Sequence, residues 1–193
     1  TEDEKKLETI AVREKEVRTA YNSAKNNRDS LDCAKAIAEA EEFLQKAQEE
    51  ILPRLNEFER NMSYDYIPGA LEFMKSLKEA GIPMAIVTSS NDVKMANAYK
   101  AHPELLELVD KVLTSEHFSK SKPDPECFLK GMEVLEGSPE ETIVFEDSFH
   151  GIAAGRASGA FVVGLATTNK SEVLTPLCDM VIDDFTQIRL EDL

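Results

Sequence analysis

Beyond Tyr66, short apolar runs of the kind that form β-strands alternate with stretches that have the apolar periodicity of helices. The predicted strands are 83–88, 109–114, 142–145, 160–165 and 180–182, and the predicted helices are 68–80, 91–101, 124–135, 148–157 and, more weakly, 170–177. Strands that alternate with helices pair in parallel, because each helix returns the chain to the same end of the sheet. The pattern therefore predicts an α/β, Rossmann-like core with a parallel sheet over residues 63–193.

The region before this core, residues 1–62, has a different composition. From residue 2 onward it contains no glycine and a single proline, Pro53, and its apolar residues recur at helical spacings on either side of a polar stretch at 26–30. We expect two helices folded back as a hairpin or cap, with Pro53 kinking or restarting the second one. The alternative is an interaction or coiled-coil arm, and an exposed apolar stripe would favour a homodimer through these helices.

Charge and cysteine content exclude several classes of function. The 193 residues carry a net charge of −15 without a cluster of Lys and Arg, which argues against nucleic acid as a partner. The three cysteines, Cys33, Cys127 and Cys178, are far apart and suggest neither a disulfide framework nor a zinc ribbon. No apolar run approaches the ~20 residues of a membrane span. We therefore expect a soluble, cytoplasmic protein.

Polar side chains follow the first predicted strand at Thr88, Ser89, Ser90 and Asn91, just before a helical pattern. Hydroxyl groups and free backbone N–H groups at the start of a helix can bind an anion such as phosphate. The alternative is that Ser90 or Asn91 only caps the helix.

A lysine follows the second predicted strand in the run S-K-S-K-P-D-P-E-C-F, residues 119–128. Pro123 restrains Lys122 to an extended conformation, outside the helix that we expect to start near Pro125. The ammonium group of Lys122 could then neutralise a phosphoryl group or a neighbouring carboxylate. The alternative is a solvated loop lysine.

Two adjacent carboxylates, Glu146 and Asp147, end the third predicted strand. Like charges side by side repel each other unless a cation joins them, and carboxylate oxygens with water suit Mg²⁺. In the alternative interpretation, Asp147 or Ser148 caps the following helix and Glu146 is exposed. His150 has no second ligand at a suitable spacing, so we expect a loop or packing histidine.

Taken in order, these three motifs resemble those of the haloacid dehalogenase-like superfamily, and of its β-phosphoglucomutase-like branch in particular. Thr88 matches the hydroxyl of the second motif, which binds the transferring phosphoryl group, and Lys122 matches the lysine of the third motif. Glu146-Asp147-Ser148 with Gly151 matches the fourth, acidic motif that holds Mg²⁺. The resemblance extends from about residue 51 to the C-terminus. It implies Mg²⁺-dependent phosphoryl transfer on small phosphorylated metabolites, with phosphatase and phosphomutase both open.

One motif of that superfamily has no counterpart in the sequence. Family enzymes attack phosphate with an aspartate in a D-x-D motif after the first core strand, and no such motif occurs here. Asp29 and Asp32 have the wrong spacing, and Asp183-Asp184 lies at the wrong end of the chain. Without that nucleophile the covalent chemistry cannot run. Two alternatives follow: a catalytically silent binding or scaffold protein, or a truncated or engineered chain whose strand with the two aspartates lies upstream of Thr1.

Overall fold

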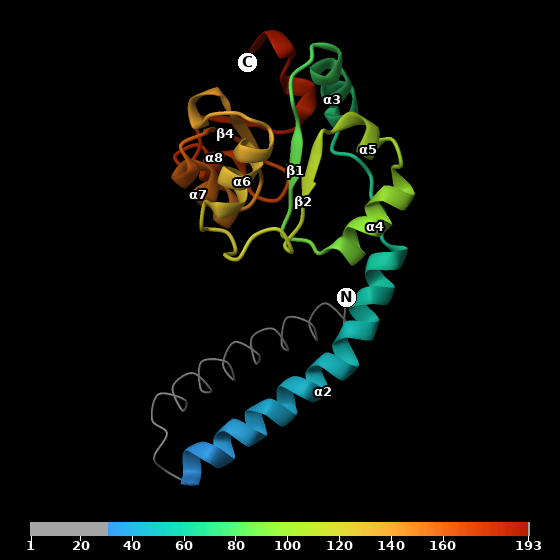
Figure 1. The fold of residues 1–193 in the computed structure, drawn as a ribbon, viewed down its shortest axis with the longest axis vertical. Coiled ribbons are helices and arrows are strands. Elements are labelled where there is room, and N and C mark those ends of the chain that lie inside the picture. Colours follow the sequence, from blue (N-terminus) through green and yellow to red (C-terminus); the bar gives the residue numbers. More distant parts are fainter. Residues whose placement is uncertain (1–30, 193) are drawn as a thin grey trace. The chain divides into compact units, whose positions relative to one another are not determined.

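The computed structural model describes residues 31–192 (Figure 1). The chain divides into two compact units, Thr1–Met62 and Ser63–Leu193. Across the described residues, no helix combines the length and the apolar character that crossing a membrane requires.

The described part of the first unit is one long helix, α2, Leu31–Asn61. Pro53 lies inside α2 without ending it. The helix therefore does not restart at Pro53, which was one of the two effects expected of this proline. Leu52, Leu55 and Phe58 follow one another at intervals of three and remain exposed, which gives the helix an apolar stripe. The first expected helix and the turn at 26–30 lie outside the described residues.

The second unit has the α/β architecture that the sequence predicts. Its helices are α3 Ala70–Glu79, α4 Asp92–Ala101, α5 Leu105–Leu108, α6 Glu126–Val134, α7 Phe149–Ser158 and α8 Ser171–Leu174, and its strands are β1 Ala85–Val87, β2 Lys111–Leu113, β3 Ile143–Glu146, β4 Phe161–Leu165 and β5 Met180–Ile182. Three 3₁₀ turns, Pro139–Glu141, Phe185–Gln187 and Leu190–Asp192, complete it. The five predicted strands and five predicted helices are all present, whereas α5 and the 3₁₀ turns were not predicted.

Within residues 31–192 the strands pair only in parallel, and they form two ladders. One sheet has the order β1-β2 and the other has the order β3-β4-β5. Ile86 is opposite Val112 in the first ladder, and Val144 is opposite Val162 in the second. The free side of β1 and the free side of β3 therefore both lack a neighbouring strand among the described residues.

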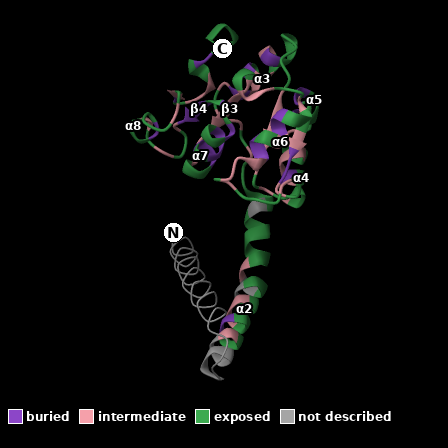
Figure 2. Ribbon diagram, turned by 60° about the vertical axis from the view of Figure 1, so that its left-hand side comes forward, coloured by how far each residue is buried: buried purple, intermediate pink, exposed green. Residues whose placement is uncertain are grey.

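Apolar side chains pack in two clusters, which belong to opposite faces of the sheets. Figure 2 shows buried residues along α6 and α7. The cluster under α6 and α7 contains Cys127, Phe128, Met132, Val144, Ile152, Ala154, Ala160, Val162 and Leu174. The cluster under α3 contains Phe73, Leu77, Val163, Leu165, Ile182 and Ile188. Val144 and Phe145 belong to different clusters because successive side chains of a strand point to opposite faces.

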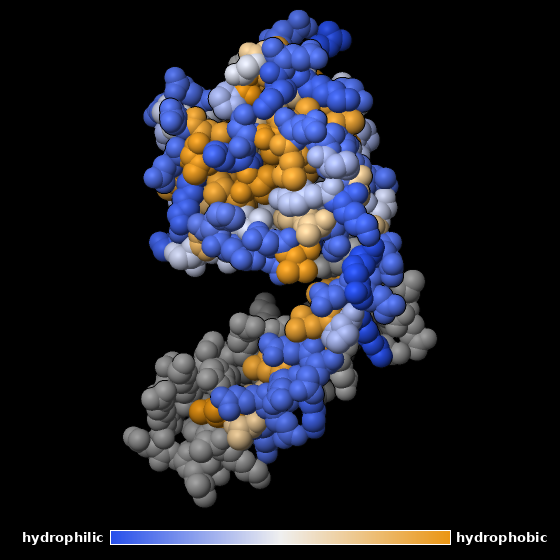
Figure 3. Space-filling view, turned by 45° about the vertical axis from the view of Figure 1, so that its right-hand side comes forward, coloured by the Kyte–Doolittle hydropathy of each residue, from blue (hydrophilic) through white to orange (hydrophobic). Residues whose placement is uncertain are grey.

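Some apolar surface of the second unit is not covered. Figure 3 shows apolar side chains gathered on one face of this unit. Among the large apolar side chains that remain exposed are Ile82, Val93, Leu106 and Leu129. The two clusters thus do not bury all the apolar surface that the unit carries.

Candidate functional site

Lys122 is at the centre of the candidate site, because it contacts the carboxyl ends of both β1 and β3. Its Nζ forms an ion pair with Oε1 of Glu146, the last residue of β3. The same Nζ donates a hydrogen bond of 3.5 Å to the carbonyl oxygen of Val87, the last residue of β1. It also lies 4.7 Å from the centre of the Phe128 ring, within reach of a cation–π interaction. The prediction that Lys122 lies outside the following helix is confirmed, since α6 begins at Glu126.

The carboxylate of Glu146 is fully engaged by its surroundings. Besides the ion pair through Oε1, its Oε2 accepts hydrogen bonds from the backbone N–H of Asp147 at 3.2 Å and of Ser148 at 3.3 Å. The hydroxyl of Ser148 donates to the same oxygen at 3.1 Å. The side chains of Lys122 and Glu146 are each only 11% exposed. Two charges so far from water persist because each is paired and hydrogen-bonded.

A glycine makes room for this carboxylate. A Cβ atom added at Gly151 would lie 2.0 to 2.2 Å from the carboxyl atoms of Glu146, far inside van der Waals contact. Gly151 is in the first turn of α7, whose N-cap is Ser148: the Ser148 Oγ accepts a hydrogen bond from the Gly151 N–H at 3.0 Å. His150, expected to be in a loop or packed, is instead exposed in this first turn, because the helix starts at Phe149.

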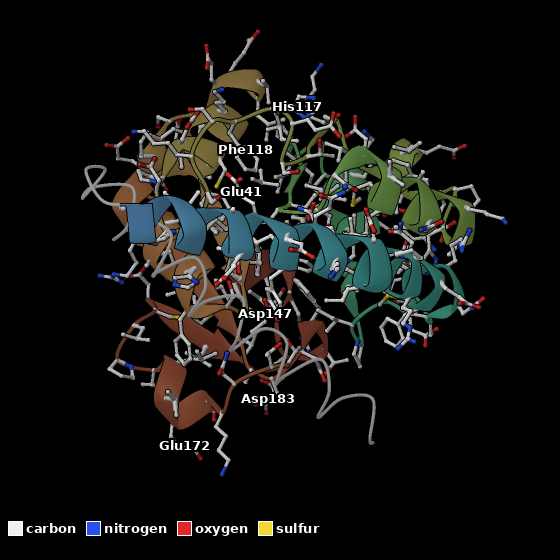
Figure 4. All side chains as sticks on the ribbon, turned by 90° about the horizontal axis from the view of Figure 1, so that it is seen from below. Glu41, His117, Phe118, Asp147, Glu172 and Asp183 are labelled. Carbon is white, nitrogen blue, oxygen red and sulfur yellow. The ribbon has the colours of Figure 1, made fainter. Side chains whose placement is uncertain are left out.

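Asp147 is held by the loop that follows β4. Its Oδ2 accepts a hydrogen bond from the Thr168 hydroxyl at 2.5 Å and a longer one from Thr167 at 3.5 Å. The side-chain amide of Asn169 donates to the Asp147 carbonyl oxygen at 3.0 Å. Figure 4 looks onto this end of the unit and labels Asp147. The sequence reasoning missed these three loop residues, although their position just after a strand is the signal that identified the others.

The segment after β1 turns sharply into α4. The Thr88 Oγ1 accepts a hydrogen bond from the Ser90 N–H at 3.1 Å, while the Thr88 N–H donates to Leu113 on β2 at 2.9 Å. Asn91 is the N-cap of α4, as the alternative interpretation of the sequence had it, and accepts from a backbone N–H at 2.9 Å. Ser89 is exposed. Thr88 is the residue next to Val87, whose carbonyl oxygen Lys122 contacts.

The loop that carries Lys122 is anchored by Glu126 at the start of α6. The Glu126 carboxylate accepts hydrogen bonds from the Ser119 N–H and hydroxyl, both at 2.9 Å, and from the Lys120 N–H at 2.8 Å. These donors stabilise the ionised form and lower the pKa of Glu126 from 4.5 to about 2. The Lys122–Pro123 peptide bond is cis. The hydrogen bonds to Glu126 thus anchor the loop from which Lys122 extends.

A second polar cluster, not predicted from the sequence, follows β2. Thr114 is only 2% exposed, and its hydroxyl donates a hydrogen bond to the Asp92 carboxylate at 2.7 Å. The Nδ1 of His117 accepts from the Thr114 N–H at 3.0 Å. Because Asp92 is in the first turn of α4, this cluster ties the end of β2 to the helix that follows Thr88.

The carboxylates at the strand ends suit a magnesium site in which water and substrate phosphate supply the other ligands. Within residues 31–192, no group of three His, Cys, Asp or Glu side chains could surround a metal ion. Mg²⁺ does not require such a cage, since it is commonly held by one or two carboxylates together with water and substrate phosphate. Asp147 is partly exposed at the strand ends and can supply one such carboxylate, whereas both oxygens of Glu146 are already engaged.

Comparison with known proteins links the chain to phosphate-processing relatives. It is 34% identical over 123 residues to validoxylamine A 7'-phosphate phosphatase of Streptomyces hygroscopicus subsp. limoneus, a match over 64% of this chain and 57% of the relative. It is 32% identical to hexitol phosphatase A of Escherichia coli, over 63% of this chain and 55% of the relative. The β-phosphoglucomutase of Mycobacterium bovis is 31% identical, over 62% and 48% of the two chains. The chain thus spans about half the length of these curated relatives.

The fold also matches that of solved structures. The crystal structure of a HAD hydrolase, family IA, variant 3 from Entamoeba histolytica superposes with a TM-score of 0.67 at 25% identity, over 83% of this chain and 69% of that one. The sequence pattern of the family described as haloacid dehalogenase-like hydrolase matches residues 5–165, most of the chain. Together with the phosphoglucomutase-like relatives, this match shows that the chain belongs to the haloacid dehalogenase-like hydrolase superfamily, in its phosphoglucomutase-like branch.

Proposed function

We propose that the carboxyl ends of β1 and β3 form the binding site for a phosphoryl group and Mg²⁺, as in a phosphatase or phosphomutase of small phosphorylated metabolites. The observation that carries this proposal is the position of Lys122, which is held between the end of β1 and the end of β3. Thr88 follows the first of these ends and Asp147 follows the second. Phosphatases and phosphomutases among the relatives support the same class of substrate.

Each residue has a definite role in this proposal. The ammonium group of Lys122 stabilises the negative charge of the phosphoryl oxygens. The hydroxyls of Thr88, Ser89 and Ser90 and the backbone N–H group of Asn91 donate hydrogen bonds to the same oxygens. Asp147 supplies a carboxylate to Mg²⁺. When bound, Mg²⁺ neutralises charge on the phosphate and orients it.

Glu146 has a different role from the one that the sequence suggested. A carboxylate with both oxygens engaged by Lys122 and by three donors of Asp147 and Ser148 has little capacity left for a metal ion. We therefore assign Glu146 to positioning Lys122, with Asp147 as the metal-binding carboxylate. The pairing also keeps the charge of Lys122 compensated while no phosphate is bound.

Phosphate binding is the direct test of this site. Titration of the chain with inorganic phosphate in the presence of Mg²⁺, followed by calorimetry, should show binding that Lys122→Met weakens at least tenfold, since a charge-assisted hydrogen bond contributes about 1.5–3 kcal/mol. Asp147→Asn should weaken Mg²⁺ binding in the same instrument. Lys170→Met, at an exposed lysine, is the matched control and should change neither. Equal phosphate affinity of Lys122→Met and the parent chain would contradict the proposal.

A second candidate function is phosphoester binding without turnover. The observation that favours it is that the sequence contains no D-x-D motif, so the chain lacks an aspartyl nucleophile in the position the family uses. Hydrolysis of p-nitrophenyl phosphate with Mg²⁺ separates the two candidates. Turnover that Asp147→Asn abolishes supports the enzyme, whereas phosphate binding without turnover supports the binding protein.

A further inference from the structure

The loop after β4, residues 166–170, is anchored at both of its ends. At its start, the Ala166 N–H donates a hydrogen bond of 2.8 Å to the carbonyl oxygen of Ile182 on β5. At its end, the Lys170 carbonyl oxygen accepts a hydrogen bond of 3.0 Å from the Val173 N–H in α8. We call this segment the β4 loop. Because β5 and α8 hold its two ends, the side chains between them have a fixed place relative to the strand ends.

The two threonines of the β4 loop serve Asp147 and not the helix that follows. A threonine just before a helix commonly caps it. The N-cap of α8 is instead Lys170, and no side-chain hydrogen bond caps this helix. The hydroxyls of Thr168 and Thr167 both donate to Oδ2 of Asp147, at 2.5 and 3.5 Å. Two hydroxyl groups thus converge on one oxygen of one carboxylate.

This arrangement makes the two carboxylate oxygens of Asp147 unequal. An ionised carboxylate oxygen offers about two acceptor positions. On Oδ2, one is occupied by the Thr168 hydroxyl and the other, at longer range, by that of Thr167. Within residues 31–192, no side chain or backbone group donates a hydrogen bond to Oδ1. Asp147 therefore presents Oδ1, and not Oδ2, to a ligand.

The backbone of Asp147 is held as well, which limits how far its carboxylate can turn. The side-chain amide of Asn169 donates to the Asp147 carbonyl oxygen at 3.0 Å, and the preceding residue, Glu146, ends β3. A rotation that brought Oδ2 toward a ligand would break the bond from Thr168. Its length of 2.5 Å is that of a charge-assisted hydrogen bond, the stronger class of such bonds.

The number of oxygens that a carboxylate offers affects which divalent cation it suits. Mg²⁺ requires near-octahedral geometry and keeps several waters, so a single carboxylate oxygen is enough for it. Ca²⁺ takes about six to eight oxygen ligands and often gains two of them from one bidentate carboxylate. A carboxylate restricted to one oxygen meets the needs of Mg²⁺ and withholds a ligand from Ca²⁺.

We propose that Thr168 determines the metal selectivity of the candidate site: its hydroxyl restricts Asp147 to coordination through Oδ1 and so favours Mg²⁺ over Ca²⁺. This inference rests on the proposed function, in which Asp147 is the metal-binding carboxylate. Thr168 contacts the metal ligand and not the metal, so it is a positioning residue. Thr167 has the same effect from a longer distance.

The test compares the affinities of the whole chain for Mg²⁺ and for Ca²⁺, each titrated alone and followed by calorimetry. Thr168→Val keeps the branched shape of the side chain and removes the donor. With Oδ2 released, the affinity for Ca²⁺ should rise relative to that for Mg²⁺ by about fivefold. The double variant Thr167→Val with Thr168→Val should shift this ratio further. A ratio that stays within about twofold of the parent value in the double variant would overturn the proposal.

Two matched variants separate the hydrogen bond from a general effect on the loop. Thr168→Ser retains the hydroxyl and should keep the selectivity of the parent chain. Thr175→Val removes the hydroxyl of another exposed threonine, one that donates to the Ser171 carbonyl oxygen at 2.8 Å, and should leave the ratio unchanged. If Thr168→Ser shifted the ratio as Thr168→Val does, the hydroxyl would not be the cause and the proposal would fall.

Asp147→Asn distinguishes failure of this inference from failure of the proposed function. If the parent chain binds Mg²⁺ no better than Asp147→Asn, Asp147 is not the metal-binding carboxylate, and both proposals are wrong. If Asp147→Asn weakens Mg²⁺ binding but Thr168→Val changes the two affinities by the same factor, the proposed function stands and the selectivity role of Thr168 is refuted. Melting curves without metal should be the same for Thr168→Val and the parent chain, because Thr168 is exposed.

Discussion

The ion pair between Lys122 and Glu146 should be a measurable contributor to the stability of the second unit. The two side chains are each 11% exposed, and Glu146 has three further hydrogen-bond donors. Removal of one partner of a buried pair leaves an uncompensated charge and costs about 3–5 kcal/mol. The residual exposure and the additional donors reduce this cost, so we expect about 2–3 kcal/mol for Glu146→Gln and for Lys122→Met.

A double-mutant cycle isolates the pair from the other contacts. In the double variant no charge remains to be compensated, so its free energy of unfolding should fall by about 2 kcal/mol less than the sum of the single variants. For a chain of 193 residues, each single variant should lower the melting temperature by about 4–12 °C, at about 2–4 °C per kcal/mol. The assay is thermal and urea unfolding followed by circular dichroism at neutral pH without phosphate or Mg²⁺.

The coupling energy decides whether the pair acts as we describe. A coupling below about 0.5 kcal/mol would be typical of two independent sites. That result would refute the view that Glu146 compensates and positions Lys122. Lys130→Met is a suitable control, because the partly exposed pair of Lys130 with Glu126 is screened by solvent and should change the melting temperature little.

Three other predictions follow from local geometry. Gly151→Ala should lower the melting temperature, because its Cβ would displace the Glu146 carboxylate, even though alanine favours a helix. His150→Ala in the same turn is the control. Equal melting temperatures of Gly151→Ala and His150→Ala would contradict the close approach of Gly151 to Glu146. Gly69→Ala should destabilise far more than Gly81→Ala: both glycines have positive φ, but only at Gly69 would the Cβ meet backbone, 2.6 Å from Thr186 N. Because the pKa of Glu126 is lowered to about 2, its contribution to stability is complete above pH 4.5 and is lost as pH falls toward 2. The difference in melting temperature between the parent chain and Glu126→Gln should therefore shrink over that range, and a constant difference would refute the hydrogen-bonded anchor.

Most of the fold could be predicted from the sequence, because local residue patterns specify the helices and strands. The five apolar runs form β1 to β5 with boundaries shifted by no more than two residues at any end, and Met180–Ile182 is unchanged. The four-residue helix α5 was missed since so short a segment has no helical periodicity to detect. The division into two ladders depends on which strands are neighbours in space, which no local pattern records.

The candidate site could be predicted from the sequence only in part. The order of the strands placed Thr88, Lys122 and Asp147 at carboxyl ends, because parallel strands end on the same side of a sheet. From the sequence, either a phosphoryl group or a carboxylate could be the partner of Lys122. In the structure, Lys122 pairs with the carboxylate of Glu146. The space that Gly151 leaves for Glu146 is a tertiary contact between β3 and α7. Such contacts are invisible in the spacing of residues along the chain.

Lys122 links the fold to the proposed phosphate site through one positive charge. Its ammonium group contacts the end of β1 through the Val87 carbonyl, the Phe128 ring on α6 and the end of β3 through Glu146. A phosphate at the strand ends competes with Glu146 for this charge. The affinity of Lys122 for phosphate is therefore lower than that of an unpaired ammonium group, unless Mg²⁺ supplies additional positive charge at the strand ends.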